Sequence, residues 1–156
     1  MANQNPQPEV YMTRHAFATT ATQGSTDTQT VFTNQANNEE VRLHGIQCHI
    51  MANATGATAG DGKAEVDNDM KVSIQVGNAK VPSQSFDIGI VHMKNDKTLH
   101  FPTPILVMFQ QPISVTLTWS DDEDPTTDIV TIVQLLGELS IQQTEGSYPH
   151  SEGGQV

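Results

Sequence analysis

The chain has a single cysteine and few positively charged residues. Cys48 is the only cysteine among 156 residues, so no disulfide can form within the chain. Seven Lys and Arg residues stand against 18 Asp and Glu residues, which gives a formal net charge of −11 at pH 7. A surface of that charge repels a phosphate backbone, so we expect no direct binding of nucleic acid.

Long apolar runs and aromatic residues are also scarce. No run of apolar residues reaches the roughly 18 residues that a helix needs to cross a membrane, so we expect no transmembrane segment. Only five Phe, two Tyr and one Trp occur, few for a catalytic sugar cleft. Phosphate-binding loops, nucleophile elbows and paired zinc-ligand motifs are missing from the sequence. We therefore expect a protein that is not an enzyme and that needs no cofactor.

The sequence does contain strand patterns, and the clearest lie between Pro104 and Ile141. From Ile113 to Trp119 apolar residues alternate with Ser114, Thr116 and Thr118. This period of two predicts a strand with one buried face and one wet face. Residues 128–141 are rich in β-branched residues and predict another strand, with a kink at Gly137.

A break in alternation marks the strand expected at residues 40–52. Val41 and Leu43 share one parity, whereas Ile46, Cys48 and Ile50 share the other. A β-bulge at Gly45 inserts one residue and brings both sets to the same face. Cys48 is then a small buried hydrophobic residue.

Further strands are predicted at residues 70–76, at 84–93 and from residue 98 onward. Turn residues separate them at spacings of about 8–12 residues, and no amphipathic helix is evident, which is typical of a β-sandwich or barrel. Residues 1–37 are rich in Thr, Ala, Gln and Asn. We interpret them as an extended N-terminal arm, residues 38–143 as the sandwich, and residues 144–156 as a C-terminal tail of flexible composition. Deleting residues 2–37 is then expected to leave a folded sandwich and to abolish large assemblies.

The densest charge cluster is an acidic turn between two predicted strands. Five carboxylates fall within residues 121–128, and oxygen ligands of this kind suit Ca²⁺. The candidate ligands are Asp121, Asp122, Asp124 and Asp128. A solvated loop explains the same composition, because the ligand spacing of an EF-hand is missing.

Two apolar segments are candidates for contacts between subunits. Residues 105–109 are apolar at every position, so both faces of that segment need cover. The predicted arm carries large apolar residues that need a surface on which to dock. The candidate interface residues are Tyr11, Met12, Phe17, Ile105, Val107 and Phe109.

Residues 101–141 combine Phe-Pro-x-Pro, Pro-Ile-x-Val-x-Leu-x-Trp and Ile-Val-x-Ile-Val-x-Leu-Leu-Gly. This segment resembles the last strands of jelly-roll capsid proteins of tailless icosahedral phages. The resemblance implies a single eight-stranded antiparallel jelly roll that assembles with itself and with other capsid proteins into capsomers or a shell. It also implies a virion protein made in the host cytoplasm. A basic arm for the genome, common in capsid proteins of small RNA viruses, is absent here.

A second hypothesis is a carbohydrate- or receptor-binding sandwich of the spike or adhesin type. Its recognition tip would consist of the loops at residues 53–69 and 120–128, with or without Ca²⁺. An assembly subunit is expected to elute far above the chain mass of 16.9 kDa at any Ca²⁺ level, whereas a Ca²⁺-dependent module is stabilised by the ion.

Overall fold

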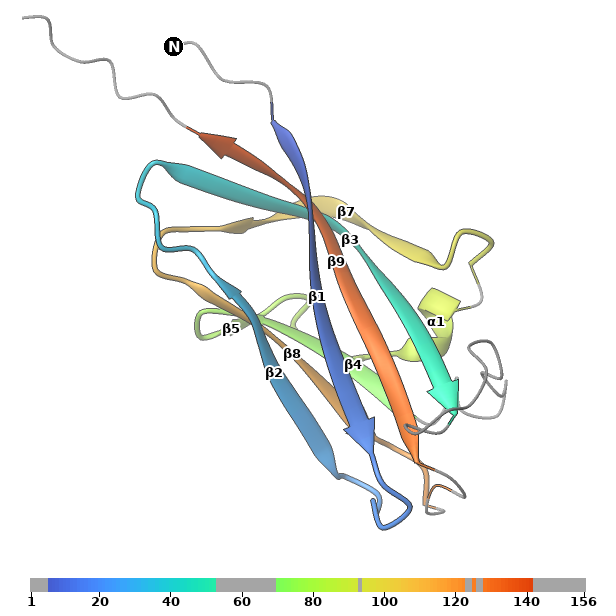
Figure 1. The fold of residues 1–156 in the computed structure, drawn as a ribbon. Helices are drawn as coiled ribbons and strands as arrows, with labels where there is room; N and C mark the ends of the chain where they lie inside the picture. The colour runs from blue at the N-terminus through green and yellow to red at the C-terminus, as the bar shows by residue number, and fades with distance from the viewer. Residues whose placement is uncertain (1–5, 53–69, 93, 123–124, 126–127, 142–156) are drawn as a thin grey trace, which may run out of the picture.

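The protein folds into two antiparallel β-sheets packed face to face (Figure 1). This computed structural model describes residues 6–52, 70–92, 94–122, 125 and 128–141. Sheet A has the strand order β1-β9-β3-β7, and sheet B has the order β2-β8-β4-β5, with β6 also paired to β4. The strands of sheet A are β1 (Gln7–Phe17), β3 (Glu39–Ala52), β7 (Thr98–Val107) and β9 (Ile129–Ile141). Those of sheet B are β2 (Thr26–Thr33), β4 (Met70–Val76), β5 (Ala79–Lys80), β6 (Phe86–Asp87) and β8 (Pro112–Trp119).

The order of the strands is that of a jelly roll. The chain passes from one sheet to the other at almost every connection, and its first and last strands pair with each other. Strands β5 and β6 pair with opposite ends of β4 and so share one position beside it. Each sheet therefore has four strand positions, which confirms the expected all-β, jelly-roll-like sandwich.

The core lies between the sheets and follows the alternation seen in the sequence. In β8, Ile113, Val115, Leu117 and Trp119 are buried, while the residues between them are only half-buried. The apolar residues of β4, the neighbouring strand in the same sheet, are buried in the same way. Trp119 packs against Phe17 of β1, with 6.0 Å between the ring centroids. The two sheets thus share one apolar layer.

The predicted bulge in β3 is confirmed. The register of β3 against both β7 and β9 shifts between Leu43 and Gly45. Leu43, Ile46 and Cys48 are all buried as a result. Burial also raises the pKa of the Cys48 thiol to about 12, so this cysteine is a buried hydrophobic residue, as expected. Strand β9 runs without interruption through Gly137, which lies opposite Leu43 at the bulge.

The prediction of a separate N-terminal arm at residues 1–37 is wrong for the described part of that segment. Strand β1 pairs with β9 along its whole length, and β2 pairs with β8. One strand of each sheet therefore comes from the supposed arm, and the sandwich begins at Gln7. The prediction failed because two inward positions of β1 are occupied by the polar residues Thr13 and His15, which hides its alternation. The tail beyond residue 141 lies outside the described residues.

The strand predicted at residues 84–93 is also wrong for most of its length. Among the described residues of this range, only Phe86–Asp87 is a strand, and a short helix, α1 (Ile88–His92), follows it. Ile88 and Val91 are fully buried, whereas Ile90 is 46% exposed. Burial of two residues three positions apart is the pattern of a helix. The alternation of Phe86, Ile88 and Ile90 had instead indicated a strand.

Candidate functional site

Exposed large apolar side chains gather at the two edges of sheet A. Strand β1 forms one edge and carries Val10 and Met12, which are 57% and 61% exposed. We call these two residues the β1 cluster. Strand β7 forms the other edge, and Leu106, Met108 and Phe109 near its end are between 43% and 53% exposed. We call these three the β7 cluster.

The β1 cluster lies on the outward face of the sandwich. Val10 pairs with Leu136 of β9, and Met12 pairs with Gln134. Leu136 is half-buried, and the next residue across the sheet is Gly45, which has no side chain. An apolar strip thus extends inward from the free edge of β1. Exposed apolar side chains that gather on one face in this way are candidates for an interaction surface.

The β7 segment does not present both of its faces. Ile105 and Val107 are buried in the protein's own core, whereas Leu106 points outward. Phe17 is also buried, at 5% exposure. These three side chains are therefore unavailable as interface residues, because the alternation of an edge strand buries every second one. Of the six candidate interface residues, Met12 and Phe109 are strongly exposed.

Tyr11, the remaining candidate, is half-buried and joins the two sheets. Its ring stacks on Phe32 of β2, with centroids 4.7 Å apart and planes inclined by 25°. Burial, with the negative charges of Glu9 and Glu39, raises the pKa of Tyr11 to about 12. Tyr11 is therefore a packing residue at the edge of the core.

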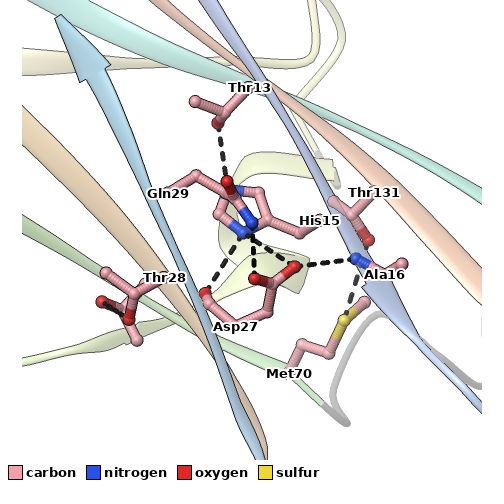
Figure 2. Close-up of polar contacts among 9 residues, drawn as sticks. Thr13, His15, Ala16, Asp27, Thr28, Gln29, Met70 and Thr131 are labelled. Atoms are coloured by element: carbon pink, nitrogen blue, oxygen red, sulfur yellow. Dashed lines mark hydrogen bonds and ion pairs between the residues drawn. The ribbon is translucent and has the colours of Figure 1, made fainter.

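A polar cluster that the sequence did not reveal connects β1 to β2 (Figure 2). The His15 side chain is fully buried, and its Nδ1 lies 3.2 Å from the carbonyl oxygen of Asp27. Because a carbonyl oxygen only accepts, Nδ1–H donates to it, and Nε2 accepts from the hydroxyl of Thr13 at 2.9 Å. The Asp27 carboxylate accepts from the backbone N–H of Ala16 at 2.9 Å and from Gln29 Nε2 at 2.7 Å.

This cluster has a hydroxyl, an imidazole and a carboxylate in series, but it is not accessible to a substrate. Thr13 is only 8% exposed, and both nitrogens of His15 already have partners within the fold. A nucleophile must reach the reacting atom of a substrate, and the Thr13 hydroxyl is enclosed between the sheets. We interpret the cluster as a structural connection between the first strands of the two sheets.

We expect His15 to make the protein less stable at acid pH. Burial lowers the pKa of His15 below its ordinary value of 6.5, although the Asp27 carboxylate opposes this shift. The unfolded chain then binds a proton more readily than the folded one. The part of the folding free energy that depends on neutral His15 is therefore fully present well above pH 6.5. It is lost progressively as the pH falls below that value. Urea unfolding at pH 8, 7, 6 and 5 measures this loss.

The matched variant for this prediction is His15→Gln, which keeps a polar side chain without a titrating ring. Its free energy of unfolding is expected to fall less between pH 7 and pH 5 than that of the wild type. His49→Gln, at an exposed histidine, is expected to follow the wild type. Parallel curves for all three proteins would contradict the role assigned to His15.

The acidic turn is described only in part. Asp121 is half-buried, Asp122 and Asp128 are exposed, and Asp124 lies outside the described residues. Asp128 accepts a hydrogen bond from the backbone N–H of Thr19 at 3.2 Å, which ties the turn to the β1–β2 connection. Among the described residues, no group of three side chains is arranged to hold a metal ion. A Ca²⁺ site in this turn remains a prediction from the sequence.

An apolar pocket of about 470 Å³ opens beside β7, an edge strand of sheet A. It is lined by the segment after β5, by β6 and α1, and by the middle of β7. Its lining residues are Val81, Pro82, Phe86, Ile90, Leu99, His100, Phe101, Pro102, Thr103 and Ile105. Sequence reasoning did not find this pocket, because its walls come from segments that fold together only in the sandwich.

The strand order and the exposed edges define an all-β, jelly-roll-like sandwich with apolar side chains at both edges of one sheet. No protein-family model and no curated protein matches the chain. The solved structure of Desmodium yellow mottle tymovirus is similar over 93% of this chain and 87% of that chain, with 14% identity and a TM-score of 0.32. A TM-score this low supports no inference, so the jelly-roll assignment rests on strand order. The described part of the chain contains no helix long and apolar enough to cross a membrane.

Proposed function

We propose that this chain is a structural subunit of a capsid-type assembly and that it associates with further copies of itself through the edges of sheet A. The observation that carries the proposal is the β1 cluster, two strongly exposed apolar side chains on a free edge strand. An edge strand also presents unpaired backbone N–H and C=O groups, which a neighbouring strand can satisfy. Proteins protect such edges with charged residues, lysine above all, and with proline. Neither β1 nor β7 contains a lysine, and the residues of this kind in them include Pro8 and Arg14 in β1 and two prolines in β7.

The positions of the two clusters favour contacts between unlike surfaces. The β1 cluster and the β7 cluster lie on opposite edges of the same sheet. A contact from the β1 edge of one copy to the β7 edge of the next leaves one edge of each copy free. Such heterologous contacts generate rings or extended lattices. Rings or lattices of that kind are what a capsomer or a shell requires.

We expect Met12→Glu to dissociate the assembly. Burying a carboxylate in an apolar contact costs at least about 2 kcal/mol, or roughly thirtyfold in dissociation constant for each contact. The molar mass measured by light scattering is therefore expected to fall toward the chain mass of 16.9 kDa. Met12 is 61% exposed in the single chain, so the thermal midpoint of the isolated subunit should stay unchanged.

The matched control is Thr30→Glu, which adds the same charge to an exposed position on β2, an edge strand of sheet B. It is expected to keep the molar mass of the wild type. Equal masses for both variants would contradict the role of the β1 edge. A wild type that is monomeric and gains thermal stability from Ca²⁺ would instead favour the carbohydrate- or receptor-binding hypothesis.

A further inference from the structure

The pocket beside β7 exists because that strand departs from its neighbour. Ile105 pairs with Leu43 and His100 pairs with Gly45, so residues 101–104 have no partner in β3. Pro102 and Pro104 lie in this segment and have no N–H to donate to a sheet. Phe101 and Pro102 of this segment line an apolar hollow together with Phe86 and Ile90. Ile90 remains 46% exposed at this site.

The segments around the pocket are the most positively charged part of the chain. Residues 70–107 contain four lysines and two aspartates, although the whole chain has a net charge of −11. Lys80 is exposed and directly precedes the lining residue Val81. Lys94 is exposed in the turn that leads into β7. An occupant that is apolar at its centre and acidic at its flanks matches this charge distribution.

The chain itself contains a segment of that chemistry. Residues 142–156, which follow β9, contain Tyr148 and Pro149 as their large apolar residues. Glu145 and Glu152 flank that pair, and the segment has no Lys or Arg. A tyrosine ring and a proline ring suit a pocket lined by two phenylalanines and two prolines.

The segment begins at the end of β9, which is separated from the pocket-lining strand β7 only by β3. Strand β9 ends at Ile141, and its residue Leu139 pairs with Val41, which pairs on its other side with Val107 of β7. The pocket begins a few residues back along β7, at Ile105. Tyr148 lies seven residues after Ile141, and an extended chain spans roughly 3.3 Å per residue, or about 23 Å for that distance.

We propose that residues 142–156 of this chain bind in the pocket beside β7. Tyr148 and Pro149 occupy the apolar hollow, and Glu145 and Glu152 face the lysines around it. The proposal does not depend on self-association, because it concerns this segment and this pocket whether they belong to one copy or to two.

A photo-crosslinking residue in place of Tyr148 tests this docking on the full-length protein. The chain is produced with p-benzoylphenylalanine at position 148, irradiated, digested and analysed by mass spectrometry. The expected crosslinks join position 148 to residues 81–90 or 99–105. Crosslinks spread over other surfaces, or concentrated on the β7 cluster, would overturn the proposal.

Two variants that add the same negative charge make the test specific. Ile90→Glu places a charge at the pocket and is expected to reduce the crosslinks about tenfold, which corresponds to about 1.4 kcal/mol of lost binding. Thr30→Glu adds the same charge to an exposed position on β2 that does not line the pocket. It is expected to keep the crosslinks. Equal crosslinking in both variants would contradict the assigned site.

Reversing the charges of the segment tests the docking without changing any side chain of the pocket. Glu145→Lys with Glu152→Lys is expected to weaken the crosslinks at low salt, and the difference from the wild type should shrink in 1 M salt. Unchanged crosslinking at low salt would contradict the proposal that Glu145 and Glu152 face the lysines around the pocket. The molar mass of each variant, measured in parallel, separates failed docking from failed self-association.

Discussion

Deleting residues 2–37 is expected to abolish the cooperative folding of this protein. The deletion removes β1 and β2, one strand from each sheet. It also removes Phe17, which packs on Trp119, and His15, whose hydrogen bonds connect the two sheets. Strands β9 and β8 would then become exposed edges beside an opened core. This outcome is the reverse of what an independent N-terminal arm predicts.

Circular dichroism and thermal unfolding of the truncated chain measure this effect. We expect no sigmoidal transition and strong binding of the dye ANS, which reports exposed apolar surface. The control is deletion of residues 2–5, which shortens the same terminus but removes no strand, and it should keep the transition. A truncated chain that still unfolds cooperatively would restore the arm as a separate element.

The substitution Gly137→Val is expected to cost about 3 kcal/mol of stability, at the upper end of what overpacking a core costs. A Cβ at position 137 would lie 2.7 Å from the carbonyl oxygen of Arg42 and 3.1 Å from Cδ2 of Leu43. The first contact involves backbone, which cannot rotate away as a side chain can. The clash therefore forces β3 and β9 apart at the bulge, where β3 changes register.

Urea unfolding of Gly137→Val beside Ser140→Val tests that expectation. Ser140 lies on the same strand and is half-buried, so its substitution controls for adding a β-branched residue to β9. We expect the midpoint of the first variant to fall sharply and that of the second to stay within the range of ordinary surface changes, about 0.5 kcal/mol. Similar midpoints would show that β3 and β9 tolerate separation at the bulge.

The elements that the sequence revealed are those whose burial follows simple alternation. Strand β8 is one example, because every second residue from Ile113 to Trp119 is apolar and buried. The bulge in β3 was also predictable, because the buried set changes parity at a glycine. In both cases the local pattern and the tertiary burial agree.

The prediction from sequence was wrong where a polar residue occupies a core position because residues elsewhere in the chain satisfy its hydrogen bonds. His15 occupies a core position of β1 only because Thr13 and Asp27 satisfy both of its ring nitrogens. Because Asp27 comes from another strand, the sequence around His15 does not indicate that this residue is buried. Strand β1 was therefore interpreted as part of an extended arm that docks on another surface. The helix α1 was missed for the related reason that three alternating apolar residues fit a strand as well as a helical turn.

The candidate interface was predicted in part, because sequence does not say which side of an edge strand faces the core. The run from Ile105 to Phe109 is apolar throughout. The structure buries Ile105 and Val107 and exposes Leu106, Met108 and Phe109. Choosing between these two sets requires the register against β3, which departs from regular pairing at residues 101–104. The pocket arises from that same departure.

The measurement that most directly tests self-association is the molar mass of the full-length wild-type protein. Size-exclusion chromatography with light scattering, followed by negative-stain imaging of the peak, gives both mass and symmetry. We predict a mass many times 16.9 kDa, independent of Ca²⁺, with rings or shells in the images. A mass equal to that of one chain at every concentration tested would contradict the proposal that this protein is an assembly subunit.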